Sequence, residues 1–191
     1  MPSPSKTIRL FVGTAISSEQ AKRLEHAGGA DISAPHWRIA PLAQWHVTAL
    51  FLGERDARYL EDYRIKVARV AERTPPIELV EGRMVTMPKT DPTMLWTRFQ
   101  PHPGLTQLHH DLAAEFGVEP SHYIPYWPHI TMGRSKGKPP EIVDGPVLVK
   151  ELVLRELTLF RSIRGERGSV HDPLATWPLS GRGPLSPEVA G

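Results

Sequence analysis

Two short apolar runs, each with a histidine and a threonine two residues apart, constrain this chain more than any other feature. The first run is residues 46–53, with His46 and Thr48; the second is residues 128–134, with His129 and Thr131. Both compositions are typical of β-strands, in which residues i and i+2 point to the same face. Each run therefore presents one imidazole and one hydroxyl side by side. Two such pairs, far apart in sequence, predict a site built from two similar halves.

Strict alternation assigns five apolar side chains of the two runs to the opposite, core-facing side. These side chains are Val47, Ala49, Phe51, Ile130 and Met132. A polar face on an otherwise buried strand needs a hydrogen-bonding partner or a ligand. The pattern therefore favours a binding or catalytic site over ordinary packing for the His/Thr faces.

The rest of the chain alternates between helical and strand-like patterns. Apolar spacings of three and four predict helices over 17–28, with a cap at Ser17 or Ser18, and over 56–73 and 103–116. Strands are expected at 8–16, 37–39, 46–53, 94–99, 129–134, 151–161 and 170–179, and two short strands joined at Gly82 are expected within 77–87. Several strands follow one another through short turns, which favours antiparallel pairing and an α+β fold.

The length of 191 residues is enough for one domain or for two small lobes. We expect a single bilobal domain over 1–179, with a loose arm at 1–6 and a disordered, Gly/Pro-rich tail at 180–191. No apolar run approaches the roughly 20 residues of a membrane span, so a cytoplasmic protein without membrane contact is expected.

The composition excludes some chemistries. There is no cysteine, which rules out disulfides, cysteine-based zinc sites and a cysteine nucleophile. A net charge of +2 and a pI near 9.0 permit an anionic partner without demanding one.

Cleavage of a phosphoester without a metal needs a base, an acid and donors that hold the phosphate oxygens. Two histidines can supply the base and the acid near neutral pH, because an unperturbed pKa of about 6.5 leaves both forms accessible. Two threonine hydroxyls can supply the donors. A phosphate between the two His/Thr pairs is therefore the chemistry that the motifs indicate.

The same motifs resemble the paired signatures of the two-histidine (2H) phosphoesterase superfamily. Within it, the chain resembles the bacterial and archaeal RNA 2′,3′-cyclic phosphodiesterases, also called 2′-5′ RNA ligases. The run Arg-Leu-Phe-Val-Gly at 9–13 is similar to that family's first strand, and residues 157–162 and 175–179 are similar to its closing strands. The likeness extends from about Arg9 to Leu179.

This resemblance implies a bilobal α+β fold with two antiparallel sheets facing each other across a central cleft. It also implies metal-independent hydrolysis of an RNA terminal 2′,3′-cyclic phosphate to a 2′-phosphate, a reversible 2′-5′ joining activity and no cofactor. Carried over to this chain, the acid–base pair is His46 and His129, and the phosphate-binding residues are Thr48 and Thr131. Which histidine is the acid stays open.

The chain departs from the family at three positions. Ala49 and Met132 stand where leucine is usual, and both substitutions are apolar. A tyrosine common near the start of the last strand is replaced by His171, which puts a role for that position in doubt.

Other residues near the motifs are weaker candidates. Arg134 can hold phosphate oxygens with its guanidinium fork, although alternation turns it away from His129 unless Gly133 carries a bulge. Tyr126 and Trp127, and also Tyr123, could stack on RNA bases. His109 and His110 are adjacent on a predicted helix, do not share a face and are not expected to bind a metal.

The expected partner is an RNA with a 2′,3′-cyclic phosphate end, bound by a monomer with no obligate protein partner. Two alternatives stay open. One keeps the chemistry but takes small cyclic nucleotides, and the other is a non-catalytic RNA- or nucleotide-binding module.

Overall fold

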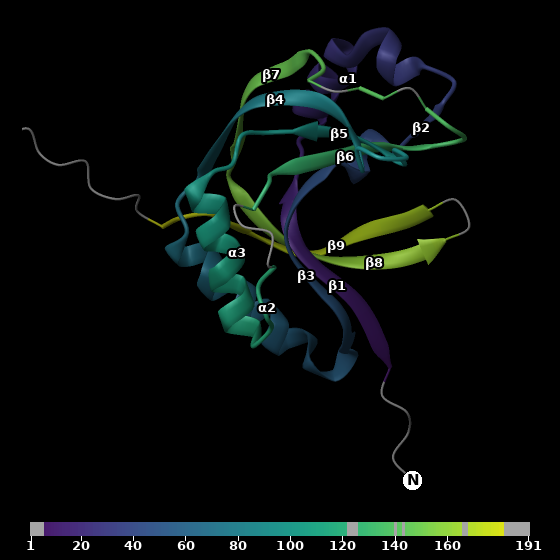
Figure 1. Ribbon diagram of the computed structural model, residues 1–191. Coiled ribbons are helices and arrows are strands. Elements are labelled where there is room, and N and C mark those ends of the chain that lie inside the picture. Colours follow the sequence, from purple (N-terminus) through teal and green to yellow (C-terminus); the bar gives the residue numbers. More distant parts are fainter. Residues whose placement is uncertain (1–5, 122–125, 140, 143, 166–167, 182–191) are drawn as a thin grey trace, which may run out of the picture.

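The computed structural model describes residues 6–121, 126–139, 141–142, 144–165 and 168–181. Its strands are β1 (Thr7–Ala15), β2 (Trp37–Ile39), β3 (His46–Asp56), β4 (Ile77–Met87), β5 (Met94–Arg98), β6 (His129–Ser135), β7 (Val147–Leu154), β8 (Glu156–Gly165) and β9 (Gly168–Pro178). Its helices are α1 (Ser18–Ser33), α2 (Leu60–Arg73) and α3 (Pro103–Phe116), with short 3₁₀ turns at Leu42–Gln44 and Ala57–Tyr59. The prediction of an α+β fold with antiparallel strands is confirmed (Figure 1).

The strands form one curled antiparallel sheet in the order β7-β4-β5-β6-β3-β1-β8-β9, with β2 paired to β6. Two sets of strands can be recognised in it: β7, β4, β5, β6 and β2 form one half, and β3, β1, β8 and β9 form the other. The halves join where β3 pairs with β6, and this pairing has a single registered pair, Val47 opposite Ile130. The two facing sheets implied by the family resemblance are therefore two halves of one sheet that curl apart from a narrow seam.

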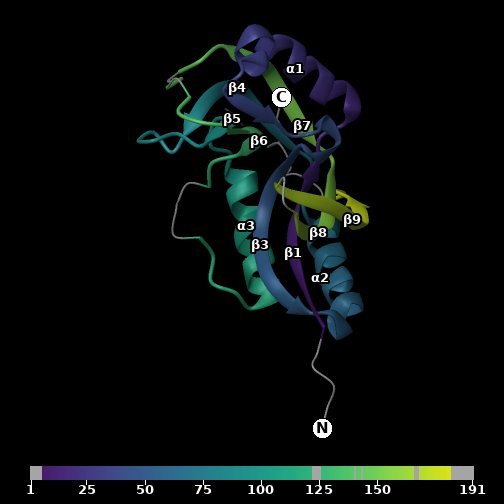
Figure 2. The ribbon, with the colours of Figure 1, turned by 90° about the vertical axis from the view of Figure 1, so that its right-hand side faces the viewer.

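Helices cover the outer faces of both halves and leave the concave side open. Helix α1 packs against β7, whereas α2 and α3 pack together and against β8, β9 and β3 (Figure 2). Leu24, Val67 and Leu112, one from each helix, are fully buried in the core. Because the helices bury the convex side, the polar faces of β3 and β6 remain available on the concave side. No helix in the described part of the chain has the length and apolar character needed to cross a membrane.

One helix and one strand continue past the glycines that were predicted to end them. Ser17 caps α1 as predicted, but the helix continues past the expected stop to Ser33 because Gly29 absorbs a kink at φ 46°. The prediction that Gly53 ends β3 is wrong: Gly53 takes φ 72° and the strand continues to Asp56. Helix α2 consequently begins later than predicted, at Leu60.

Two strand predictions are also wrong. Residues 77–87 form a single strand, in which Glu81 takes a positive φ of 53° and a register shift follows Gly82. The strand expected at 151–161 is two strands separated at Arg155, and these belong to different halves of the sheet. The strand-like sequence pattern continues through Arg155. Only the pairing partners of β7 and β8 show that the chain passes from one half of the sheet to the other at this residue.

The ends of the expected domain fall partly within the described residues. Ser180 and Gly181, at the start of the expected tail, donate main-chain hydrogen bonds to the carbonyls of Ala71 and Thr74. Residues 1–5 of the expected arm at 1–6, and the tail beyond Gly181, lie outside the described residues.

Candidate active site

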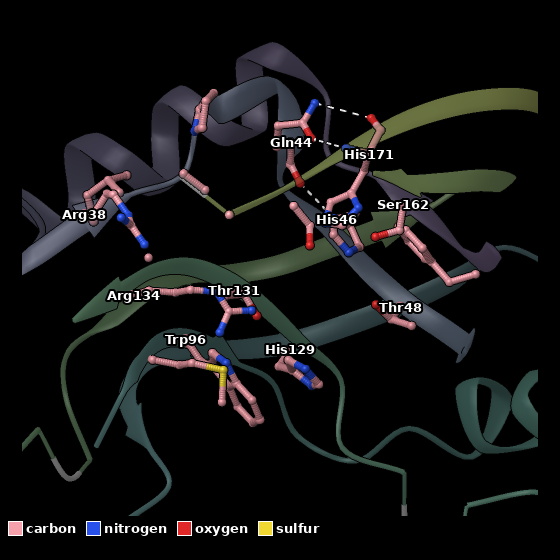
Figure 3. Close-up of a pocket in the computed structure, with 18 of the residues that line it drawn as sticks. Arg38, Gln44, His46, Thr48, Trp96, His129, Thr131, Arg134, Ser162 and His171 are labelled. Carbon is pink, nitrogen blue, oxygen red and sulfur yellow. Dashed lines mark hydrogen bonds between the residues drawn. The ribbon is translucent and has the colours of Figure 1, made fainter. Parts of the chain in front are cut away.

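A cleft of about 530 Å³ opens where the two halves of the sheet diverge. His46 and Thr48 reach it from β3, and His129 and Thr131 reach it from β6, so that the two pairs lie on facing walls (Figure 3). The described residues that line the cleft are Arg9, Phe11, Arg38, Ile39, Ala40, Pro41, Gln44, His46, Thr48, Phe51, Met94, Trp96, His129, Thr131, Gly133, Arg134, Ser162, Arg164, Gly168, Ser169 and His171. The structure thus brings together the four residues of the two motifs.

Both histidines are oriented by the same hydrogen bond. His46 Nδ1 lies 2.7 Å from the carbonyl oxygen of Gln44, and His129 Nδ1 lies 3.0 Å from the carbonyl oxygen of Trp127. In each case the carbonyl belongs to the residue two positions earlier. A carbonyl only accepts, so each Nδ1 carries the hydrogen, and Nε2 is the atom free to take or give a proton.

An aromatic ring supports each imidazole. The ring centroids of Phe11 and His46 are 4.9 Å apart, and those of Trp96 and His129 are 3.9 Å apart with the rings nearly parallel. Neither ring was singled out in the sequence, because each belongs to a neighbouring strand whose register the pattern does not give. These contacts fix the imidazole planes and exclude water from one side of each.

Burial dominates the protonation equilibria of both groups. It lowers the pKa of His46 to about 4; the hydrogen bond to Gln44 opposes this shift, and the like charges of His171 and His129 add to it. Burial also lowers the pKa of His129, against the opposing effect of its bond to Trp127. Proton uptake by either group is therefore disfavoured, and an anion bound between them would reverse that tendency.

A β-bulge in β6 turns Arg134 into the cleft. Trp96 lies opposite Thr131 and Leu95 lies opposite Gly133, so Met132 is the extra residue. The sequence allowed for a bulge at Gly133, and the observed bulge is one residue earlier. It turns Arg134 to the same face as Thr131, and both side chains line the cleft (Figure 3). A guanidinium beside the hydroxyl offers a fork of donors to phosphate oxygens.

A corresponding bulge in β3 brings Phe51 to the cleft. Gly13 lies opposite Thr48 and Val12 lies opposite Leu50, which leaves Ala49 as the extra residue. The prediction that Phe51 faces the core is wrong, because the bulge reverses the alternation after Thr48. The ring is 51% exposed and lines the cleft.

His171 belongs to the site even though its place in the family pattern argued against it. Its ring centroid lies 4.9 Å from that of His46, edge to face. The Gln44 side chain fixes its backbone: Gln44 Oε1 accepts from the His171 N–H at 2.6 Å, and Gln44 Nε2 donates to the His171 carbonyl at 3.3 Å. Gln44 therefore orients His46 through its carbonyl and ties β9 to the same point through its side chain. Neither motif gives a sequence signal for this link.

The charged side chains that line the cleft are all cationic. Besides Arg134, three arginines line it from other strands, namely Arg9, Arg38 and Arg164. The described lining residues include no aspartate or glutamate. Among the described residues, no three or more His, Asp or Glu side chains converge as metal ligands would. Imidazoles, hydroxyls and guanidiniums suit an anion such as a phosphate.

The aromatic residues proposed from sequence as base contacts do not line the cleft. Tyr126 donates its hydroxyl hydrogen to the Thr48 carbonyl at 3.1 Å and stacks on His109. Trp127 is 41% exposed beneath Arg98, outside the cleft. Tyr123 lies outside the described residues.

Buried His109 has a structural role. Its Nδ1 lies 2.7 Å from the Ala49 carbonyl oxygen, and its Nε2 accepts from the Ser121 N–H at 2.8 Å. Both ring nitrogens are therefore used, which ties α3 to the back of β3 behind Thr48. This arrangement leaves no ring nitrogen for a metal.

Comparison with known proteins agrees with this geometry. A family model described as the 2′-5′ RNA ligase superfamily matches residues 17–161. The chain belongs to this superfamily. The resemblance inferred from the two motifs is thereby confirmed, as is the expected class of enzyme, a cyclic phosphodiesterase of the 2H type.

Individual relatives span nearly the whole chain. The RNA 2′,3′-cyclic phosphodiesterase of Thermus thermophilus is 29% identical over an alignment of 183 residues, and the match covers 91% of this chain and 91% of its own. The crystal structure of TT0787, also of Thermus thermophilus, is 27% identical, with a TM-score of 0.77 over 92% of this chain and 100% of its own. LigT of E. coli, in its apo form, shares the fold with a TM-score of 0.72 at 24% identity, over 91% of this chain and 98% of its own.

Proposed function

We propose that this protein hydrolyses the 2′,3′-cyclic phosphate at the 3′ end of an RNA to a 2′-phosphate, using His46 and His129 as its acid–base pair. One observation carries the proposal. Two imidazoles from facing walls of one cleft each donate Nδ1–H to a main-chain carbonyl, and each has a threonine hydroxyl beside it. The name of the Thermus relative supports the general activity, cleavage of an RNA 2′,3′-cyclic phosphate.

The reaction needs one histidine neutral and the other protonated. The neutral Nε2 takes a proton from water as the water oxygen bonds to phosphorus. The bond from phosphorus to O3′ breaks, and the protonated Nε2 of the other histidine gives its proton to that oxygen. Thr48, Thr131 and Arg134 donate to the remaining phosphate oxygens as charge moves among them.

Joining is the same displacement with a different nucleophile. A 5′-hydroxyl of a second RNA replaces water, the bond to O3′ breaks, and a 2′-5′ linkage results. The reverse reaction restores the cyclic phosphate and the 5′-hydroxyl. All of the groups named come from one chain, which supports a monomeric enzyme.

The experiment that tests the proposal uses a short RNA with a 2′,3′-cyclic phosphate end, incubated with the protein in EDTA. We expect a 2′-phosphate product, identified by its resistance to a 3′-specific phosphatase. Activity should be unaffected by EDTA because imidazoles, hydroxyls and a guanidinium supply every group in the mechanism. A strict need for an added divalent metal would overturn the mechanism.

Two other results would redirect the proposal. A 3′-phosphate product would keep the two-histidine chemistry but show that O2′ leaves. No turnover of the RNA, with turnover of a mononucleoside 2′,3′-cyclic phosphate, would identify a small-nucleotide enzyme.

The pH dependence should be bell-shaped, with the optimum of kcat/KM below pH 6.5. This parameter reports the free enzyme, in which burial lowers the pKa of both histidines, that of His46 to about 4. The singly protonated pair is most populated between the two values and declines as pH rises above them. The optimum of kcat should lie at higher pH, because the bound phosphate anion stabilises an imidazolium. A kcat/KM that rises steadily to pH 10 would contradict a histidine pair.

A further inference from the structure

Two arginines lie directly opposite each other on neighbouring strands beside the cleft. Arg98 on β5 is the partner of Arg83 on β4 and, on its other side, of His129 on β6. Directly opposed residues of antiparallel strands point to the same face of a sheet, so both guanidiniums lie on the face that carries His129. Neither arginine is among the described residues that line the cleft. The pair therefore extends the cationic surface beyond it.

No carboxylate in the described part of the chain neutralises this pair. Arg83 and Arg98 form no ion pair with any acidic residue that the structure describes. Glu81, two residues before Arg83, instead accepts a hydrogen bond from the Gln100 side chain at 3.3 Å. Like charges directly opposite each other destabilise a sheet, and both arginines are partly buried. An anion that bridges the two guanidiniums would offset their repulsion.

Trp127 holds the Arg98 guanidinium in place. The central carbon of the guanidinium lies 4.8 Å from the centroid of the indole ring, which is a cation–π contact. This contact leaves the N–H donors of Arg98 available to an anion. The Trp127 carbonyl also accepts the hydrogen of His129 Nδ1 at 3.0 Å. One residue therefore positions both an imidazole of the cleft and the first guanidinium beyond it.

The position of the arginine pair suits the next phosphate of an RNA chain. Neighbouring strands lie about 4.8 Å apart, so the backbone at Arg98 is one strand from His129 and the backbone at Arg83 is two strands, or about 10 Å, from it. The reacting cyclic phosphate is expected at His129. The phosphodiester on the 5′ side of the terminal nucleotide is the next anion along the RNA, one ribose away from the cyclic phosphate.

From these positions we propose that Arg83 and Arg98 form a second phosphate site, which binds the phosphodiester on the 5′ side of the terminal nucleotide, with Trp127 positioning Arg98. The proposal rests on the cyclic phosphodiesterase function and adds a substrate preference. Guanidiniums bind phosphate oxygens as a fork, and such contacts fix the position of a nucleic acid without reading its bases. A mononucleoside cyclic phosphate lacks this phosphodiester, so the site favours RNA ends over small cyclic nucleotides.

The test uses two dinucleotides that end in a 2′,3′-cyclic phosphate, one with a natural phosphodiester linkage and one with a neutral methylphosphonate linkage. Bases and sugars are the same in both, so only the linkage differs. The wild type should prefer the phosphodiester in kcat/KM by about 10- to 150-fold, the range for a hydrogen bond to a charged group. Arg98→Gln should lose most of this preference, and Arg83→Gln combined with Arg98→Gln should lose all of it.

Adenosine 2′,3′-cyclic phosphate is the substrate control, because it has no phosphodiester on its 5′ side. Both arginine variants should turn it over with the kcat/KM of the wild type, which a folding defect would not allow. Arg155→Gln is the matched protein control and removes the same charge from an exposed position. The neighbouring Leu154 pairs with Ile77, the first residue of β4, which lies about 20 Å from Arg83 along the strand. Arg155→Gln should keep the preference.

Trp127→Leu tests the positioning of Arg98. It removes the aromatic face but keeps the main-chain carbonyl that holds His129. The phosphodiester preference should therefore fall, while kcat/KM for adenosine 2′,3′-cyclic phosphate stays unchanged. Trp127→Phe keeps an aromatic face and should retain most of the preference. An equal loss on both substrates in Trp127→Leu would contradict the positioning role.

A binding measurement keeps this proposal separable from the proposed reaction. If the wild type turned over no cyclic phosphate, calorimetric titration with the two dinucleotides ending in a 2′-phosphate would still test the site. Tighter binding of the phosphodiester by the wild type, with equal binding of both linkages by the double arginine variant, would support it. A wild type that cleaves or binds both linkages equally would overturn it, and so would equal losses of preference in Arg98→Gln and Arg155→Gln.

Discussion

Replacing either His46 or His129 by alanine should lower kcat by about 10²- to 10⁴-fold, the range for loss of one acid or base. The expected loss follows from the geometry, because each imidazole is held with Nε2 toward the cleft by a carbonyl and an aromatic ring. Single-turnover rates with a cyclic-phosphate RNA measure it. The double variant should be little worse than the single ones, since the two groups act in one step.

His26→Ala is the control for these substitutions. His26 is exposed on α1, outside the residues that line the cleft, and its removal should leave kcat unchanged. If His46→Ala or His129→Ala kept more than a tenth of the wild-type rate while folded, the two-histidine mechanism would be contradicted. If both variants still bound the RNA and the wild type had no turnover, the non-catalytic binding module would be favoured.

Element bounds could be predicted from the sequence where the local pattern of apolar residues ends at the same residue as the observed element. The periodicity of residues 103–116, with Pro103 at the first position and Gly117 after the last, predicts helix α3 with its observed bounds. The strand pattern failed at Arg155, because β7 and β8 read locally as one run although they pair with β4 and β1. Pairing partners depend on the whole chain, and no local period encodes them.

The two His/Thr motifs were readable for a different reason. His46 and Thr48, like His129 and Thr131, precede the bulges in their strands, so simple alternation places each pair correctly. Beyond each bulge the alternation reverses. That reversal is why Phe51 was assigned to the core and why Arg134 could be placed in the cleft only conditionally.

Residues from other strands escaped prediction because their partners are distant in sequence. Gln44 contacts His171 through hydrogen bonds that span 127 residues, and Trp96 meets His129 only because β5 pairs with β6. The family pattern has a tyrosine at the position of His171, which put a role for this residue in the site in doubt. The structure shows that its ring and backbone both pack at His46 through contacts that a sequence motif does not contain.

Arg134→Ala should lower kcat/KM by about 10²- to 10³-fold, the usual effect of removing one donor that stabilises developing charge. The bulge at Met132 places this guanidinium beside Thr131, at the wall where the phosphate is expected. Arg134→Lys should recover only part of the loss, because an ammonium is a point charge without the planar fork. Steady-state kinetics with the cyclic-phosphate RNA at fixed ionic strength measure both variants.

Arg58→Ala separates the specific effect of Arg134 from a general loss of positive charge. Arg58 is ion-paired with Asp56 and lies outside the residues that line the cleft. Removing it changes the net charge by the same amount, so any long-range attraction of RNA is weakened equally and falls with added salt. If Arg134→Ala and Arg58→Ala lowered kcat/KM alike, and both effects vanished at high salt, Arg134 would act only through charge. A loss that persists at high salt in Arg134→Ala alone would place its guanidinium on the reacting phosphate.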